Sequence, residues 1–63
     1  MNLIRHFSCQ VSFKHQPQEY HDSMKELCRS LLGGEIYREN GTAGIILSTE
    51  TRADGVYLYC VQK

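Results

Sequence analysis

Three cysteines are the residues of this sequence that most directly suggest chemistry, because thiolates bind zinc and act as nucleophiles. They are Cys9, Cys28 and Cys60. No two of them form the C-x-x-C pair that is typical of structural zinc sites. Each falls on the apolar side of a predicted strand or helix, and free cysteine is among the most buried residue types. We therefore expect reduced thiols packed in the core, with no metal and no cofactor.

The run His21-Asp22-Ser23 contains the residue types of a catalytic triad. Neighbouring residues of a helix point about 100° apart, so these three side chains cannot form a hydrogen-bonded relay. His21 and Cys28 are close enough in sequence to share a helix face as a thiolate pair, but no oxyanion-stabilising motif accompanies them. The sequence therefore predicts no catalytic residue and a protein that is not an enzyme.

Tyrosines near arginines form a third group with chemical potential. Such residues suit a base-stacking platform for single-stranded RNA or DNA, and tyrosine is also enriched at the centre of protein interfaces. Acidic residues are interspersed among them here, and the 7 basic and 7 acidic residues give a net charge of zero. Nucleic-acid-binding domains normally carry a basic patch. We therefore expect a protein partner and keep single-stranded nucleic acid as the alternative.

The elements that would position these groups follow from the spacing of apolar residues. Residues 7–13 alternate between apolar and polar types, which is typical of a half-buried strand. Pro17 suits the first turn of a helix, and the glycines at 33 and 34 suit its end. Apolar residues recur at helical spacing between them. The stripe predicted to pack on a sheet comprises Tyr20, Met24, Leu27, Cys28 and Leu31.

Two turn signals divide the rest of the chain into three strands. Asn40-Gly41 predicts a two-residue hairpin turn with Tyr37 opposite Gly44. Asp54-Gly55 predicts a second hairpin with Glu50 opposite Tyr59, although a longer loop there would shift this register.

The predicted order is strand, helix, strand, strand, strand. This order indicates an α+β two-layer sandwich, β-α-β-β-β, with one helix packed on a mostly antiparallel three- to four-stranded sheet. The first strand is expected at an edge of the sheet, parallel to its neighbour through a right-handed helical crossover. With 63 residues, we expect a single small domain that spans residues 1–63.

The predicted sheet has two apolar faces and only one helix to cover them. The face expected to pack on the helix carries Ile36, Ala43, Ile45, Leu47, Thr49, Leu58 and Cys60. Tyrosines on the other face suit an open sheet surface as strand formers, and they equally suit a contact surface. We favour a contact, made by the face or by strand addition at an edge, with a foreign protein or a second copy. The predicted partner-binding residues are Tyr37, Ile46, Arg52, Tyr57, Tyr59 and Val61.

The expected location follows from the termini and the cysteine count. An odd number of cysteines disfavours a disulfide-stapled secreted fold. The start MNLIRHFSCQ lacks the apolar run of a signal peptide, and no stretch is long and apolar enough to span a membrane. We therefore expect a cytoplasmic protein that does not enter a membrane.

The segment LCRSLLGGEIYRENGTAGIILS, residues 27–48, and the earlier VSF at 11–13 resemble a small podovirus protein that antagonises the host's histone-like nucleoid silencer. The shared layout is a strand, a helix that ends in Leu-Cys-basic, glycines, a strand and an Asn-Gly turn. The resemblance covers the second half of the chain better than the first, where the helical stretch is shorter here. It implies a phage- or prophage-encoded inhibitor of a host regulator, and it adds no binding residues.

Overall fold

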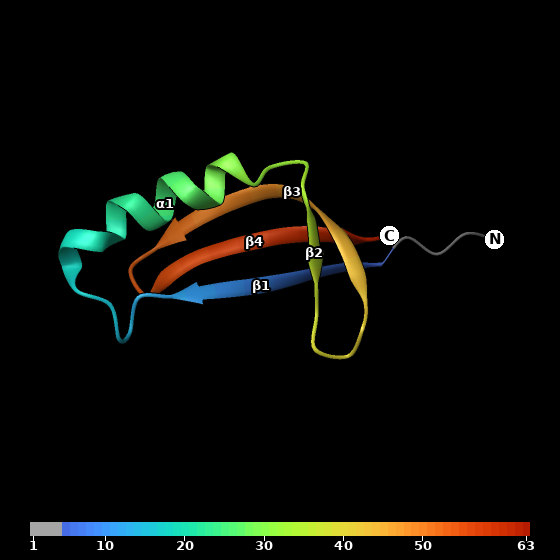
Figure 1. Ribbon diagram of the computed structural model, residues 1–63, viewed down its shortest axis with the longest axis horizontal. Helices are drawn as coiled ribbons and strands as arrows, with labels where there is room; N and C mark the ends of the chain where they lie inside the picture. Colours follow the sequence, from blue (N-terminus) through green and yellow to red (C-terminus); the bar gives the residue numbers. More distant parts are fainter. Residues whose placement is uncertain (1–4) are drawn as a thin grey trace.

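One helix packs on part of one face of a four-stranded antiparallel sheet in the computed structural model, which describes residues 5–63 (Figure 1). Along the chain the elements are β1 (His6–Ser12), the short 3-10 helix η1 (Gln18–Tyr20), α1 (His21–Ser30), β2 (Glu35–Tyr37), β3 (Ala43–Arg52) and β4 (Gly55–Gln62). Across the sheet the strand order is β1-β4-β3-β2. The predicted α+β class and the β-α-β-β-β order are confirmed.

The first strand joins the sheet at an edge, as predicted, but in the opposite direction. β1 pairs with β4 in the antiparallel sense, with His6 opposite Val61 and Ser12 opposite Gly55. Two hairpins connect β2, β3 and β4, so β2 and β4 run in the same direction and β1 runs against both. The prediction of a parallel pair is wrong because α1 does not return the chain to a strand beside β1; it leads to β2 at the far edge.

The core lies between α1 and the inner face of β3 and β4. Its buried side chains are Phe13, Cys28, Ile46, Val56, Leu58 and Cys60. Cys28 and Cys60 are 3% and 1% exposed, and burial raises the pKa of both thiols. The expectation of core packing is therefore confirmed for these two, while Cys9 is half-buried on β1.

The predicted apolar stripe of the helix packs only in part. Cys28 is buried and Met24 packs against the core, but Leu27 and Leu31 are 62% and 43% exposed. Tyr20, just before α1, is exposed as well. The prediction that all five residues pack on the sheet is wrong, because α1 contacts only β3 and β4 among the strands of residues 5–63. The face of α1 that packs on the sheet is therefore narrower than the predicted apolar stripe.

The first hairpin turns through three residues instead of two. Ile36 lies opposite Gly44 and Tyr37 opposite Ala43, so the predicted pairing of Tyr37 with Gly44 is wrong by one position. The Gly41 N–H donates to the carbonyl three residues earlier at 2.9 Å, and Gly41 has a φ of +85°. A turn followed by a glycine of positive φ is typical of three-residue hairpins.

The second hairpin begins earlier than predicted. Arg52 lies opposite Gly55, and Glu50 lies opposite Tyr57 instead of Tyr59. The predicted pairs are therefore wrong by two positions. Because side chains alternate with a period of two, this shift leaves each of these residues on the face that was predicted for it.

A bulge at Leu47 exchanges the two faces of β3 halfway along the strand. The pairing with β4 shifts by one residue between Ile46 and Ser48, which leaves Leu47 as the extra residue. Ile46 is consequently in the core and 3% exposed, whereas Leu47 is 54% exposed. The predicted placement of Ile46 on the open face is wrong, as is that of Ile45 and Leu47 on the inner face, because a strand with an inserted residue breaks the period of two.

The sheet curls so that the β2–β3 hairpin folds over β1 (Figure 1). The ring of Phe7 covers Gly44, where a Cβ atom would lie 2.5 Å from Phe7 Cζ. The guanidinium carbon of Arg38 lies 4.8 Å from the centre of the same ring. The inner face is therefore covered by α1 at one end and by this hairpin at the other.

Candidate functional site

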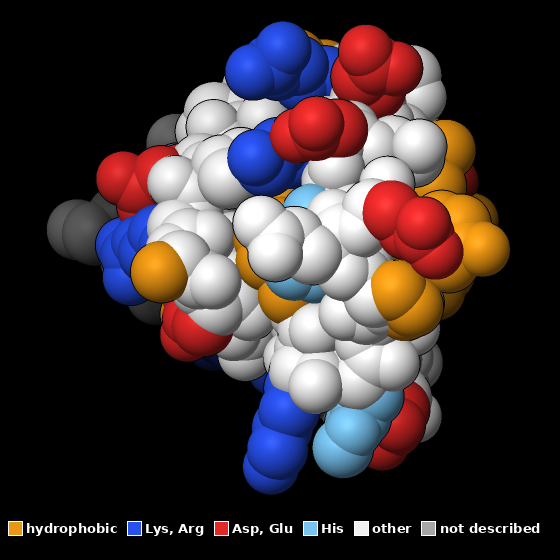
Figure 2. Space-filling model, turned by 90° about the vertical axis from the view of Figure 1, so that its left-hand side faces the viewer, with side chains coloured by type: hydrophobic (Ala, Val, Ile, Leu, Met, Phe, Trp, Pro, Cys, Tyr) orange, Lys and Arg blue, Asp and Glu red, His pale blue; other side chains and the backbone are white. Residues whose placement is uncertain are grey.

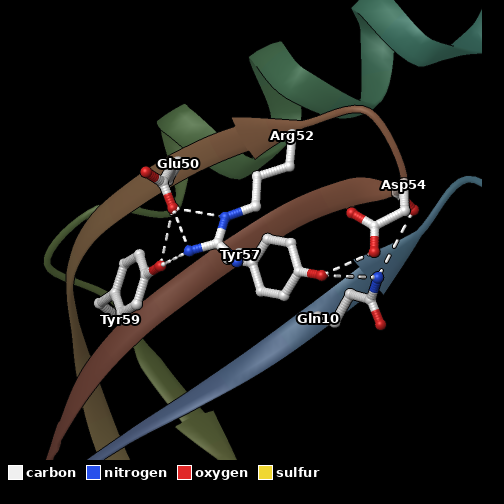
Figure 3. A network of polar contacts seen from close by, with 6 residues as sticks. All are labelled: Gln10, Glu50, Arg52, Asp54, Tyr57 and Tyr59. Atoms are coloured by element: carbon white, nitrogen blue, oxygen red, sulfur yellow. Dashed lines mark hydrogen bonds and ion pairs between the residues drawn. The ribbon is translucent and has the colours of Figure 1, made fainter.

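Polar contacts join the tyrosines of β4 to charged side chains on the open face of the sheet (Figure 3). The Tyr59 hydroxyl donates to Glu50 Oε2 at 2.8 Å, and Arg52 Nε–H donates to the same oxygen at 2.8 Å. Arg52 Nη2 also donates to the Tyr59 hydroxyl oxygen at 3.0 Å. These residues share a face because β3 and β4 are adjacent and each alternates with a period of two beyond the bulge.

Tyr57 forms the second half of this network. Its hydroxyl donates to Asp54 Oδ2 at 2.8 Å and accepts from Gln10 Nε2 at 3.2 Å. The guanidinium carbon of Arg52 lies 4.4 Å from the centre of the Tyr57 ring, which is a cation–π contact. Arg52 therefore links both tyrosines, and it occupies one side of the Tyr57 ring.

The network lowers the pKa of the Glu50 carboxyl group and raises the pKa values of Tyr57 and Tyr59. The hydrogen bond from Tyr59 and the contacts with Arg52 lower the pKa of Glu50, because they stabilise the carboxylate. The hydrogen bond to Glu50, and then burial, raise the pKa of Tyr59. For Tyr57, the hydrogen bond to Asp54 is the largest cause of a raised pKa.

We expect Glu50→Gln to lower the pKa of Tyr59 toward its ordinary value of about 10. The raised pKa of Tyr59 stabilises the fold below about pH 10, and this contribution is lost as the pH rises through the folded-state value. The contribution of Glu50 is present above about pH 4.3 and is lost as the pH falls through its lowered value. NMR titration of the tyrosine rings measures this change. Tyr57 is the internal control, since its largest shift comes from Asp54, and an equal drop at both tyrosines would contradict the prediction.

An apolar hollow of about 450 Å³ opens beside Tyr59 on the same face. It is lined by His6, Phe7, Ser8, Leu47, Ser48, Tyr59 and Cys60. Leu47 reaches this hollow because the bulge turns its side chain out of the alternating pattern, as bulges commonly do. The open face thus has an apolar centre at Leu47 and Tyr59 with polar side chains around it.

Of the six residues predicted to bind a partner, three lie together in the network and two lie away from it. Arg52, Tyr57 and Tyr59 are in one network, and Val61 follows them along the same face of β4. Ile46 is in the core. Tyr37 is on β2, where it lines a different hollow with Cys9 and Arg38.

Tyr37 belongs to a separate group of polar contacts at the C-terminal end of β4. It is 70% exposed, and its hydroxyl donates to Glu35 Oε2 at 2.6 Å. The other carboxylate oxygen of Glu35 pairs with Lys63. The two bonds to Glu35 lower the pKa of this carboxyl group.

Sequence reasoning missed two residues of the site. Regular alternation predicts Leu47 and Ile45 on the inner face, but Leu47 lines the hollow and Ile45 lies opposite Val61 on the open face. The run Ala43–Arg52 contains no proline, and its one glycine, Gly44, lies three residues before the bulge, so the alternation did not indicate Leu47 as the inserted residue. The acidic residues Glu50 and Asp54 are among those that disfavour nucleic acid by composition, but the sequence does not reveal that they accept hydrogen bonds from the tyrosines.

Charges of both signs are interspersed over the end of the molecule that lies at the left of Figure 1 (Figure 2). Hydrophobic side chains gather along the right-hand edge of that view. Within residues 5–63 no three His, Cys, Asp or Glu side chains are grouped to hold a metal ion, and no helix is long and apolar enough to span a membrane. Comparison of the chain with protein-family models, curated proteins and solved structures finds no match.

Proposed function

We propose that this chain is a small non-enzymatic interaction protein, an inhibitor or adaptor that binds a protein partner through the open face of its sheet. The observation that carries this proposal is the bulge, which holds Leu47 54% exposed beside Tyr59 in an apolar hollow. Protein interfaces combine an apolar centre with a polar rim and are enriched in tyrosine and arginine. Here Arg52, Glu50 and Ser48 supply that rim.

The polar network supports binding without a large loss of side-chain entropy. Arg52, Tyr57 and Tyr59 are already held by hydrogen bonds and the cation–π contact. Ordering a flexible side chain at an interface costs about 0.5–1.5 kcal/mol. Side chains that are fixed before the partner arrives avoid part of this cost, so the network favours the face as a binding surface.

Two observations disfavour the alternative of single-stranded nucleic acid on the same face. The guanidinium group of Arg52 covers one side of the Tyr57 ring, on which a base would have to stack. Arg52 is also paired with Glu50, so its charge is not free for a phosphate. We therefore favour a protein partner. The podovirus resemblance suggests that this partner is a host regulator in the cytoplasm.

Leu47→Ser tests this proposal, with Leu27→Ser as the matched control. Both leucines are more than half exposed, but Leu27 is on the helix that covers the opposite face. We expect a protein captured from bacterial lysate and then purified to bind Leu47→Ser at least about 10-fold more weakly, since central interface residues contribute about 2 kcal/mol. The control should bind as the wild type does. Equal binding by Leu47→Ser, or binding only to single-stranded nucleic acid with a steep salt dependence, would contradict the proposal.

A further inference from the structure

The outer edge of β1 presents a row of backbone groups that no strand of residues 5–63 pairs with. The Gln62 N–H donates to the Arg5 carbonyl, and the Phe13 N–H donates to the Asp54 carbonyl. In an antiparallel pair such bonds recur at every second residue. Odd-numbered residues of β1 therefore bond to β4, and the even-numbered residues direct their N–H and C=O groups outward.

The strand itself lacks the features that normally prevent strand addition, and the β2–β3 hairpin crosses its inner side near Phe7 and Cys9. Natural edge strands are protected by charged side chains, proline, bulges or short length. β1 is seven residues long, has an uninterrupted register with β4, and contains no Lys, Arg, Asp, Glu or Pro in His6–Ser12. The opposite edge, β2, has only three residues and includes Glu35.

The inner side of β1 is also incompletely covered. Phe7, Cys9 and Val11 point to this side and are half-buried. Among residues 5–63, α1 lies over β3 and β4, and no Cα atom of α1 approaches β1 within 8 Å. The apolar side chains of β1 thus lie beside the helix, where the β2–β3 hairpin covers Phe7 and all three remain half-buried.

We propose that a second copy of this chain binds to the β1 edge, so that two β1 strands pair in the antiparallel sense about a two-fold axis at Cys9. This register uses all seven residues of the strand. On the inner side it places Phe7 opposite Val11 of the second copy and Cys9 opposite its own equivalent, so apolar residues meet apolar residues. On the open side Ser8 lies opposite Gln10 of the second copy. A strand without charged side chains meets itself without like-charge repulsion.

The resulting dimer contains a continuous eight-stranded sheet in which the even-numbered residues form the new hydrogen bonds. It uses the backbone edge of β1, whose residues His6, Phe7 and Ser8 line one side of the hollow, while Leu47 and Ser48 on β3 are not part of the new strand pair. This proposal therefore goes beyond the proposed function and is tested separately from it.

The test is the solution mass, measured by light scattering over a concentration series, for the wild type, Ser8→Pro and Ser8→Lys. Ser8 directs its N–H outward, so proline there removes a bond of the proposed pair and none to β4. Lysine keeps the strand and adds a charge to the edge. Ser30→Lys is the matched control, since it adds the same charge on the exposed end of α1. We expect the wild type and Ser30→Lys to form dimers. Both Ser8 variants should raise the dissociation constant of the dimer at least about 10-fold.

A second measurement tests the register. Cys9 would form a pair without hydrogen bonds in the dimer, where Cα atoms are about 4.5 Å apart, which is within reach of a disulfide. Diamide, which accepts the two protons and two electrons of the thiol pair, should link two wild-type chains but not two Cys9→Ser chains. A wild-type monomer, a dimer that both Ser8 variants leave unchanged, or a monomer that binds only a foreign strand would overturn the proposal.

Discussion

Gly55→Ala is expected to lower the free energy of unfolding by about 2–3 kcal/mol, the cost of overpacking a site that cannot relax. A Cβ atom at this position would lie 2.4 Å from the Val11 carbonyl oxygen and 3.1 Å from Ser12 Cα. Both neighbours are backbone atoms of β1, so the strand itself would have to move. The φ of +158° adds strain for any residue with a side chain. Urea denaturation followed by circular dichroism measures the loss.

Gly41→Asn is the matched control for this prediction. Gly41 also has a positive φ, of +85°, but a Cβ atom there meets nothing within 4 Å. Asparagine tolerates the left-handed conformation better than other residues with a side chain. The control should change the free energy of unfolding by about 0.5 kcal/mol or less. Similar losses for both variants would mean that β1 and the start of β4 are not as close as the structure shows.

Ile46→Ala is expected to lower the free energy of unfolding by about 2–5 kcal/mol, as is usual when a buried aliphatic side chain is truncated. Ile46 is 3% exposed and contacts the core on the inner face of β3. Leu47→Ala removes a similar volume one residue later, where the side chain is 54% exposed. Its expected cost is about 0.5 kcal/mol or less.

The contrast between these neighbours tests the bulge directly. Without it, the strand would alternate regularly from Ser48 back to Ala43, and Leu47 instead of Ile46 would face the core. A large loss for Leu47→Ala together with a small one for Ile46→Ala would therefore rule out the observed register. Chemical denaturation of both variants under the same conditions decides between the observed register and a strand without the bulge.

The helix, the strands and the faces of β4 could be predicted because they depend on local patterns. Alternation in residues 55–62 correctly separated Leu58 and Cys60 from Tyr57 and Tyr59. The same alternation placed Arg52 beside these tyrosines, even though the predicted pairs were off by two positions. An error of two residues does not change which face a side chain occupies.

The register of the first hairpin and the faces of β3 were not predicted, because both depend on the insertion of a single residue. The first hairpin uses three loop residues where Asn40-Gly41 suggested two, and the bulge adds Leu47 to β3. The bulge exchanges the faces of the first half of β3, and the extra loop residue reverses this exchange for β2, so Ile36 packs against the core as predicted. The prediction that the whole helix stripe packs was wrong for a different reason. Leu27 and Leu31 are exposed, although they have the same helical spacing as the residues that pack. How much of that stripe the sheet would cover depends on tertiary packing, which the sequence pattern does not encode.

The brevity of β2 limits how far this sheet can grow. A protein with two long unprotected edges can polymerise, because each added chain offers a new edge to the next. Here one edge is only three residues long, carries Glu35 paired with Lys63, and curls over the inner face of the sheet. The proposed strand addition therefore uses the β1 side alone. An assembly formed in this way ends at two copies and does not extend into a fibre.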